Sequence, residues 1–189
     1  MSESKSLLLR SLQKEILEIP PIWYMRQAGR YMPEYRKIRS KFNNFLDMCK
    51  NPEICCELAL QPINSFNLDS AILFSDILTI PEALGLKLEF IEGTGPVFHN
   101  KIRSEKDINQ LIEFDPQALS FAYEAIRMTK RELPSHIPII GFCGSPWTMA
   151  AYCIEGKSST DFQHTNTYNL NDNTFVSSLQ PHLECLCSC

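Results

Sequence analysis

Two arginines, Arg26 and Arg30, stand four residues apart on either side of a Gln-Ala-Gly run in a segment that begins with two prolines. A guanidinium presents a planar fork of N–H donors that binds a carboxylate through two hydrogen bonds. The glycine lets backbone N–H groups approach an anion without a Cβ in the way. These residues indicate a pocket for a small molecule with several carboxylates or phosphates. The alternative is a solvated basic helix face after a turn.

The segment from Arg26 to Lys41 is basic within an acidic chain. It holds six Lys and Arg residues against the single acid Glu34, whereas the whole chain has 18 Lys and Arg against 22 Asp and Glu. A local excess that runs against the global charge favours a site for an anionic ligand. We expect a small-molecule polycarboxylate as the partner and no nucleic acid.

A second candidate residue is Asp76, which comes shortly after the continuous apolar run Ala71–Phe74. Such a run is typical of a strand buried on both faces of a parallel sheet. In a (β/α) barrel the active site lies at the carboxyl ends of the strands, so a carboxylate at this position is a candidate catalytic residue. The residues alone leave open the alternative that Asp76 caps a helix predicted at 77–84.

The elements that must position these residues alternate between strands and helices. Buried strands are predicted at 71–74 and 137–142, and a hairpin arm at 86–90. Proline is favoured at the first position of a helix, often directly after a residue that caps the helix. Helices are therefore predicted to begin at Pro33, Pro52, Pro116 and Pro146. The alternation predicts parallel βαβ units and therefore an α/β fold.

Three finer predictions concern the N-terminal third of the chain. The spacing of Leu8, Leu12 and Ile16 predicts a short amphipathic helix. Residues 22–25 are predicted to form a strand that leads into the arginines, and Pro62 is predicted to kink the helix that begins at Pro52 or to end it early.

The segment Trp23–Tyr35, which contains both arginines, resembles the N-terminal signature of the uroporphyrinogen decarboxylase family. The segments Phe74–Gly85 and Gly141–Tyr152 are similar to two further family segments, and the resemblance covers about residues 6–162. It implies a (β/α)8 TIM barrel. It also implies a cytoplasmic lyase of heme and porphyrin biosynthesis that removes four acetate carboxyls from uroporphyrinogen III to give coproporphyrinogen III.

The resemblance also implies roles for individual residues. Asp76 is the central catalytic residue, and Arg26 and Arg30 hold substrate carboxylates as part of the catalytic set, with the proton donor left open. The remaining substrate contacts are Gln27, Ala28, Gly29, Arg39 and Tyr152. The family needs neither a metal nor an organic cofactor, because the protonated pyrrole itself accepts the electrons. Uroporphyrinogen is the implied small-molecule partner, and a homodimer is implied for the full-length protein.

The length and the C-terminal composition predict an incomplete barrel. A TIM barrel needs roughly 250 residues, and this chain has 189. We expect residues 1–162 to be the N-terminal portion of the barrel, with only its first βα units, and residues 163–189 to be an unrelated, disordered tail without Lys or Arg. The family also uses a serine and a C-terminal histidine that have no matching segment here, so we expect a truncated, inactive chain.

The cysteines and the hydropathy indicate a cytoplasmic protein. We expect buried free thiols, because the cysteines before the tail lie in apolar, periodic segments, namely Cys49, Cys55, Cys56, Cys143 and Cys153. The one-residue spacings of Cys185, Cys187 and Cys189 beside His182 argue against a metal site. No apolar run is long enough to span a bilayer, and the N-terminal apolar core is too short for a secretory signal.

Three functional interpretations remain at the level of the sequence. The first is a uroporphyrinogen decarboxylase, truncated and inactive. The second is a related barrel methyltransferase acting on corrinoid-bound methyl groups, whose zinc ligands would lie in a part of the barrel that is not present here. The third is a non-enzymatic fragment that at most binds polyanions.

Overall fold

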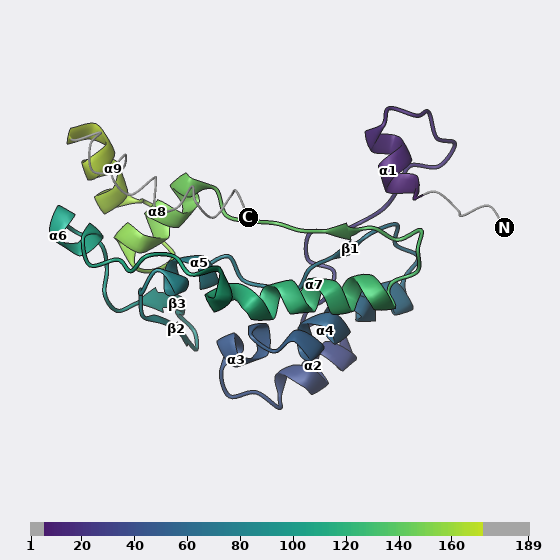
Figure 1. The fold of residues 1–189 in the computed structure, drawn as a ribbon, viewed down its shortest axis with the longest axis horizontal. Coiled ribbons are helices and arrows are strands. Elements are labelled where there is room, and N and C mark those ends of the chain that lie inside the picture. Colours follow the sequence, from purple (N-terminus) through teal and green to yellow (C-terminus); the bar gives the residue numbers. More distant parts are fainter. Residues whose placement is uncertain (1–5, 172–189) are drawn as a thin grey trace. The chain divides into compact units, whose positions relative to one another are not determined.

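The computed structural model describes residues 6–171 of the chain, and these residues form two compact units (Figure 1). Unit 1 combines residues 6–75 with residues 120–142, and unit 2 combines residues 76–119 with residues 143–171. Each unit is therefore assembled from two separate stretches of sequence and has hydrophobic clusters of its own.

Unit 1 is mostly helical, with a short parallel pair of strands. Its elements are α1 (Leu7–Leu12), α2 (Pro33–Arg39), α3 (Phe45–Cys49), α4 (Pro52–Ser65), β1 (Ala71–Ile72), α7 (Ser120–Glu132) and β4 (Ile139–Ile140). β1 and β4 pair in parallel with Ala71 opposite Ile139, which confirms the predicted parallel arrangement.

The two strands of unit 1 are shorter than the apolar runs that predicted them. The N–H of Ala71 donates to the carbonyl of Pro138 (3.0 Å), and the N–H of Leu73 donates to the carbonyl of Ile140 (3.0 Å). Ala71 and Leu73 are buried, but β4 is only half-buried and Phe142 is 44% exposed. The prediction of a fully buried strand at 137–142 is therefore wrong. Within the described residues β4 pairs with β1 alone, which leaves its other edge uncovered.

Helices α2, α4 and α7 pack together in unit 1. The Asn51 side chain accepts the N–H of Ile54 (2.9 Å) and caps α4, as the Asn-Pro signal predicts. The helix does not end at Pro62 but continues to Ser65, so the predicted early end is wrong. Pro62 is buried, and its carbonyl still accepts the N–H of Phe66 (2.9 Å). Packing of α4 against its neighbours outweighs the one hydrogen bond that a proline removes.

The segment before the arginines is less regular than predicted. Helix α1 ends at Leu12, Lys14 has a positive φ of 64°, and Ile16 is 98% exposed rather than part of a helix. Residues 22–25 do not form a strand. Only Ile22 makes ladder-like bonds, since its N–H donates to the Asp69 carboxylate (2.7 Å) and its carbonyl accepts the Asp69 N–H (2.9 Å). The two prolines before Ile22 have no N–H to extend such a ladder.

Unit 2 contains a hairpin, two longer helices and several short turns of helix. Its elements are α5 (Thr79–Ala83), β2 (Leu88–Ile91), β3 (Gly95–Phe98), α6 (Glu105–Ile108), the 3-10 helix η1 (Pro116–Leu119), α8 (Pro146–Glu155) and α9 (Gln163–Asn171). β2 and β3 pair antiparallel with Leu88 opposite Phe98, which confirms the predicted hairpin arm. Gly93 adopts a φ of +78° at the turn, a conformation that favours glycine.

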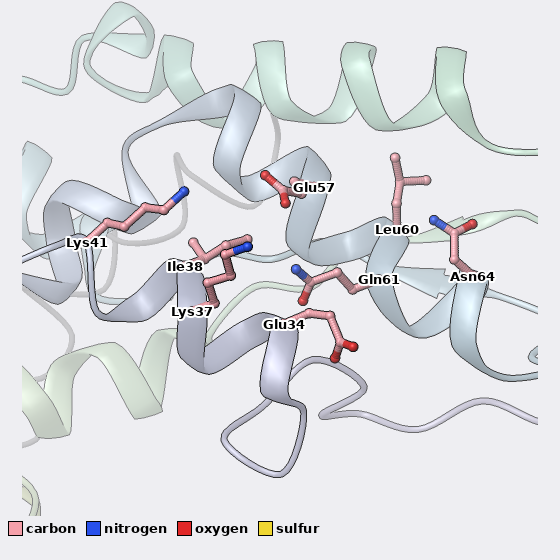
Figure 2. Close-up of a pocket in the computed structure, with 8 residues that line it drawn as sticks. All are labelled: Glu34, Lys37, Ile38, Lys41, Glu57, Leu60, Gln61 and Asn64. Carbon is pink, nitrogen blue, oxygen red and sulfur yellow. The ribbon is translucent and has the colours of Figure 1, made fainter.

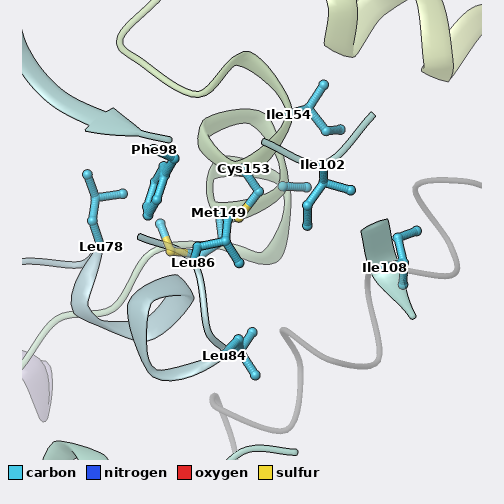
Figure 3. Packing of buried hydrophobic residues seen from close by; sticks show 10 residues of the cluster. Leu78, Leu84, Leu86, Phe98, Ile102, Ile108, Met149, Cys153 and Ile154 are labelled. Atoms are coloured by element: carbon cyan, nitrogen blue, oxygen red, sulfur yellow. The ribbon is translucent and has the colours of Figure 1, made fainter. Parts of the chain in front are cut away.

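One hydrophobic cluster joins the hairpin of unit 2 to α8 (Figure 3). Phe98 is fully buried in the same cluster as Met149 and Ile154 of α8, and the Phe98 N–H donates to the Gly156 carbonyl (2.7 Å). Helix α8 begins with Ser145, whose hydroxyl accepts the N–H of Thr148 (3.2 Å), as the Ser-Pro signal predicts. This packing fixes the helix that carries the candidate Tyr152.

The beginning of the predicted tail has regular structure. Residues 163–171 form helix α9, and the N–H and hydroxyl of Thr165 both donate to Glu155 Oε1 of α8 at 2.9 Å. The rest of the predicted tail, 172–189, including His182 and the three cysteines beside it, lies outside the described residues. The predicted boundary at residue 162 is therefore not a boundary between helical and irregular structure.

The five cysteines among the described residues are free thiols, as predicted. Four of them are buried, but Cys143 is exposed, which corrects the expectation that all five are buried. Burial raises the pKa of Cys55 and of Cys153 to about 12. In the part of the chain that the structure describes, no helix has the length and apolar character needed to cross a membrane.

Candidate functional site

The arginine loop, residues 26–32, leads into α2 and is folded by its own side chains. Gln27 is 2% exposed, and its Oε1 accepts the N–H of Tyr24 (3.1 Å). The hydroxyl of Tyr31 donates to the carbonyl of Gln27, and the N–H of Met32 donates to the carbonyl of Gly29 (2.9 Å). These bonds close the loop into a turn and leave both candidate arginines exposed.

The cations of this segment divide into two kinds. The Nη1 of Arg36 lies 2.7 Å from the carbonyl oxygen of Arg30 and 3.3 Å from the next carbonyl oxygen, and the Nη1 of Arg39 lies 2.6 Å from that of Phe42. By contrast, the side chains of Arg26 and Arg30 make no hydrogen bond or ion pair within residues 6–171. Two arginines thus stabilise the backbone, and two remain free for a ligand.

The backbone of the arginine loop supplies further donors. Ala28 and Gly29 are half-buried, and their N–H groups meet no acceptor in the described part of the chain. A Cβ at Gly29 would lie 3.4 Å from the ring of Tyr31, so the ring packs closely over the glycine. The loop can therefore offer two guanidinium groups and two backbone N–H groups to an anion.

Asp76 lies at the turn that leads into α5. Its Oδ1 accepts the N–H of Leu78 (2.8 Å), and its carbonyl accepts the Thr79 hydroxyl (2.8 Å). Helix α5 begins at Thr79 rather than at residue 77, and its N-cap residue is Leu78, so Asp76 orders the turn before the helix and is not the cap that the alternative interpretation predicts. Burial raises the pKa of Asp76, and the bond from Leu78 acts in the opposite direction. The second carboxylate oxygen has no donor among the described residues. The hydrogen bond within the turn therefore engages only one of the two carboxylate oxygens of Asp76.

Tyr152 lies on α8 and is half-buried. Its ring packs against the hydrophobic cluster of unit 2, which also contains Leu78, two residues after Asp76. Within residues 6–171 its hydroxyl makes no hydrogen bond. The ring is structural, and the hydroxyl is available to a ligand.

The predicted site residues are distributed over both units. Unit 1 holds Arg26, Gln27, Ala28, Gly29 and Arg30 in one loop, with Arg39 in the last turn of the helix that follows. Unit 2 holds Asp76 and Tyr152, both beside the same hydrophobic cluster.

A groove of about 400 Å³ between α2 and α4 was not predicted (Figure 2). It is lined by Glu34, Lys37, Ile38, Lys41, Glu57, Leu60, Gln61 and Asn64, none of which is a predicted site residue. Its two lysines are balanced by two acids, so it is not the anion pocket that the basic segment predicts. The i, i+4 spacing of Lys37 and Lys41 is the one sequence signal that points to it.

The histidines and acids that the structure describes form no larger cluster. Among residues 6–171 no group of three or more His, Cys, Asp or Glu side chains is placed to hold a metal ion. His99 lies across the hairpin from Glu89, with 2.6 Å between Nε2 and Oε2. His136 is exposed.

The family model described as uroporphyrinogen decarboxylase matches residues 3–184 of the chain. The chain belongs to the uroporphyrinogen decarboxylase family. The match extends beyond Phe162, where we expected the resemblance to end. The family has a TIM-barrel fold, with which the α/β composition and the parallel β1–β4 pair agree.

Two curated relatives show how much of this family the chain covers. A uroporphyrinogen decarboxylase of Francisella philomiragia is 55% identical over 160 residues, and one of Legionella pneumophila is 53% identical over 161 residues. These alignments cover 84% and 85% of this chain but 46% of each relative. The chain thus spans about half the length of the uroporphyrinogen decarboxylases that it matches.

Among solved structures, a methyltransferase from Methanosarcina mazei has a similar fold. The TM-score is 0.70 with 18% sequence identity, over 95% of this chain and 52% of that one. At this identity the similarity concerns the fold alone. It therefore does not favour methyl transfer over decarboxylation.

Proposed function

We propose that the protein acts in the decarboxylation of uroporphyrinogen III to coproporphyrinogen III in porphyrin biosynthesis. The observation that carries the proposal is the division of the arginines: within residues 6–171 the guanidinium groups of Arg26 and Arg30 are unbonded, whereas those of Arg36 and Arg39 are bonded to backbone carbonyls. A substrate with eight carboxylates matches exposed guanidinium groups on a fixed loop.

In this proposal the arginine loop binds and orients the substrate. Arg26 and Arg30 hold substrate carboxylates, and the N–H groups of Ala28 and Gly29 add neutral donors. A guanidinium is a poor acid at neutral pH, so we assign both arginines to binding rather than to proton delivery. Arg39 contributes less than the sequence suggests, because one of its N–H groups already bonds the Phe42 carbonyl.

Asp76 acts on the reacting pyrrole. Protonation of the pyrrole ring gives a cation, the bond between the acetate CH₂ and its carboxyl carbon breaks, and the electron pair flows into the ring as CO₂ leaves. A proton on the exocyclic carbon then completes the methyl group, and the ring releases the proton that it first took up, so that the pyrrole is restored and one proton in total replaces the CO₂. Ionised Asp76 stabilises the cation more than the neutral substrate, which is differential binding of the transition state. The pyrrole itself accepts the electrons, so the proposal requires no cofactor.

The test uses a chimera that joins residues 1–162 to the remaining part of the Francisella philomiragia relative. We expect this chimera to convert uroporphyrinogen III to coproporphyrinogen III, and the Arg26→Ala/Arg30→Ala variant to lose at least about tenfold in kcat/KM. The matched control is Lys37→Ala/Lys41→Ala, which removes the same charge from α2 and the residues that follow it. Equal effects of the two double variants would refute the arginine pocket.

The 189-residue chain is tested beside the chimera. We expect it to bind uroporphyrin, the oxidised octacarboxylate, but to form no coproporphyrinogen. Binding without turnover by both proteins would instead favour the non-enzymatic, polyanion-binding interpretation. The homodimer and the cytoplasmic location implied by the family remain predictions, to be checked by sedimentation and by cell fractionation.

A further inference from the structure

Arg36 stands out among the cations of α2, because its guanidinium reaches back to the arginine loop. Its Nη1 lies 2.7 Å from the carbonyl oxygen of Arg30 and 3.3 Å from that of Tyr31. Its own backbone N–H donates to the Met32 carbonyl (3.1 Å). One residue therefore bonds three successive carbonyls of the loop, two through the side chain and one through the backbone.

We propose that Arg36 is a positioning residue for Arg30. By holding the carbonyls of residues 30 and 31 it fixes the backbone from which the Arg30 side chain projects, so that this guanidinium is oriented before a ligand arrives. The inference rests on the proposed function, because it names the residue that prepares the carboxylate-binding arginine of that same site.

Three physical points support this role. Within the described residues no other donor reaches the carbonyls of Arg30 and Tyr31, so the bonds from Arg36 are the ones that orient them. Both bonds are charge-assisted and therefore stronger than neutral ones. Because a loop that is already ordered loses less entropy on binding, preorganisation of the loop translates into affinity.

The neighbouring cation provides a contrast. Lys37 is the next residue on α2 and is also exposed, but its side chain lines the groove between α2 and α4 (Figure 2). It makes no hydrogen bond to the arginine loop. Replacing Lys37 therefore removes one positive charge from the same helix without touching the carbonyls that Arg36 holds.

The first experiment measures hydrogen exchange in the 189-residue chain without ligand. The N–H of Met32 closes the turn by bonding the Gly29 carbonyl. We expect Arg36→Ala to raise the exchange rate of this amide about tenfold, the effect of losing roughly one charge-assisted bond. Lys37→Ala should leave the rate unchanged, and Arg36→Lys, which keeps the charge but not the fork, should fall between the two. Unchanged exchange in Arg36→Ala would overturn the proposal.

The second experiment is a double-mutant cycle on the binding of uroporphyrin, followed by fluorescence. We expect Arg36→Ala to weaken binding about tenfold in the unaltered chain but less than about twofold in an Arg30→Ala background, because the residue acts through Arg30. Fully additive effects would overturn the positioning role, since they would mean that Arg36 acts independently of Arg30. Far-ultraviolet circular dichroism checks that each variant is folded, and Arg36→Gln replaces Arg36→Ala if that variant does not fold.

The two failures are separable. If neither the unaltered chain nor the chimera binds uroporphyrin, the proposed function is refuted, whereas the exchange measurement still decides whether Arg36 holds the loop. If binding is normal but Arg36→Ala leaves both exchange and affinity unchanged, the positioning role is refuted and the proposed function is unaffected.

Discussion

The arginine loop of unit 1 exposes its charged side chains to water, whereas the turn around Asp76 in unit 2 partly buries its charged side chain. In the loop, Arg26 and Arg30 are exposed, whereas the polar side chain of Gln27 between them in the sequence is buried. In the turn, the carboxylate of Asp76 is itself withdrawn from water beside a hydrophobic cluster, and burial raises its pKa. The first arrangement keeps its charges hydrated, and the second pays a desolvation penalty for its charge.

This difference separates recognition from chemistry. Exposed cations attract an anionic ligand over a distance set by ionic strength, and they bind without a large desolvation cost. A carboxylate in a less polar environment interacts more strongly with a cation that develops beside it. Asp76 should therefore affect turnover most, and the arginines should affect binding most.

The largest expected effect is on turnover. In the chimera, Asp76→Asn should lower kcat by about 10²–10³-fold, because the amide still accepts the Leu78 N–H but carries no negative charge to stabilise a cation. KM for uroporphyrinogen should change little. Steady-state kinetics measure both constants, and near-normal turnover would mean that Asp76 only orders the turn before α5.

The next effect is on affinity. Arg30→Lys keeps the charge but loses the planar fork, so uroporphyrin binding should weaken by about 1–3 kcal/mol. Affinity of the unaltered chain should also fall as salt is added, because exposed charges are screened. Calorimetric titrations at two ionic strengths measure both effects. If neither the substitution nor added salt changed the affinity for uroporphyrin, the arginine pocket would be contradicted.

A smaller effect is expected under the arginine loop. Gln27 accepts the Tyr24 N–H through Oε1, but its Nε2 is buried and has no partner in the described part of the chain. Gln27→Ala should therefore lower the free energy of unfolding by about 1–3 kcal/mol, through the lost acceptor and the cavity. Gln27→Met should cost less, because it fills the space and removes the unpaired donor. Denaturant titration measures both variants, and an equal cost would show that the unpaired Nε2 does not matter.

The smallest effect concerns pH and stability. The pKa of Asp76 is higher in the folded state than in the unfolded state, so folding favours its protonated form. The stability that this preference contributes is fully present below the unfolded pKa and is lost as pH rises through the folded value. At neutral pH, Asp76→Asn should therefore melt at a slightly higher temperature than the parent chain, and at about pH 3 the difference should vanish. Thermal melts at the two pH values check this, and a lower Tm for the variant at neutral pH would contradict it.

Local signals in the sequence predicted the elements around the site well. The caps at Asn51 and Ser145, the hairpin at β2–β3 and the helix that carries Tyr152 all follow from a few neighbouring residues, and the structure confirms them. Each depends on a backbone preference or on a hydrogen bond within one turn, and the residue types in that turn determine both.

Features that depend on distant packing were not predictable in this way. The continuation of α4 past Pro62 depends on its packing, and the absence of a strand at 22–25 depends on which partner Ile22 finds. Which arginine side chains are bonded depends on where the backbone carbonyls of Arg30 and Phe42 point. The sequence alone shows six similar cations between residues 26 and 41 and does not distinguish them. The family resemblance assigned roles to Arg26 and Arg30 but did not distinguish Arg36.

The interleaving of the two units has a consequence for folding during synthesis. The bond between the Ser70 hydroxyl and the Pro138 carbonyl spans 68 residues, a separation that the ribosome covers in roughly 3–14 s at about 5–20 residues per second. Until then β1 has no partner strand, and Cys55 and Leu73 lack the Ala125 side chain that completes their cluster. Residues 76–119 of unit 2 emerge in this interval but await α8 in turn. Neither unit can fold to completion before the first stretch of the other has been made, so apolar side chains that each unit later buries stay exposed on the nascent chain during those seconds.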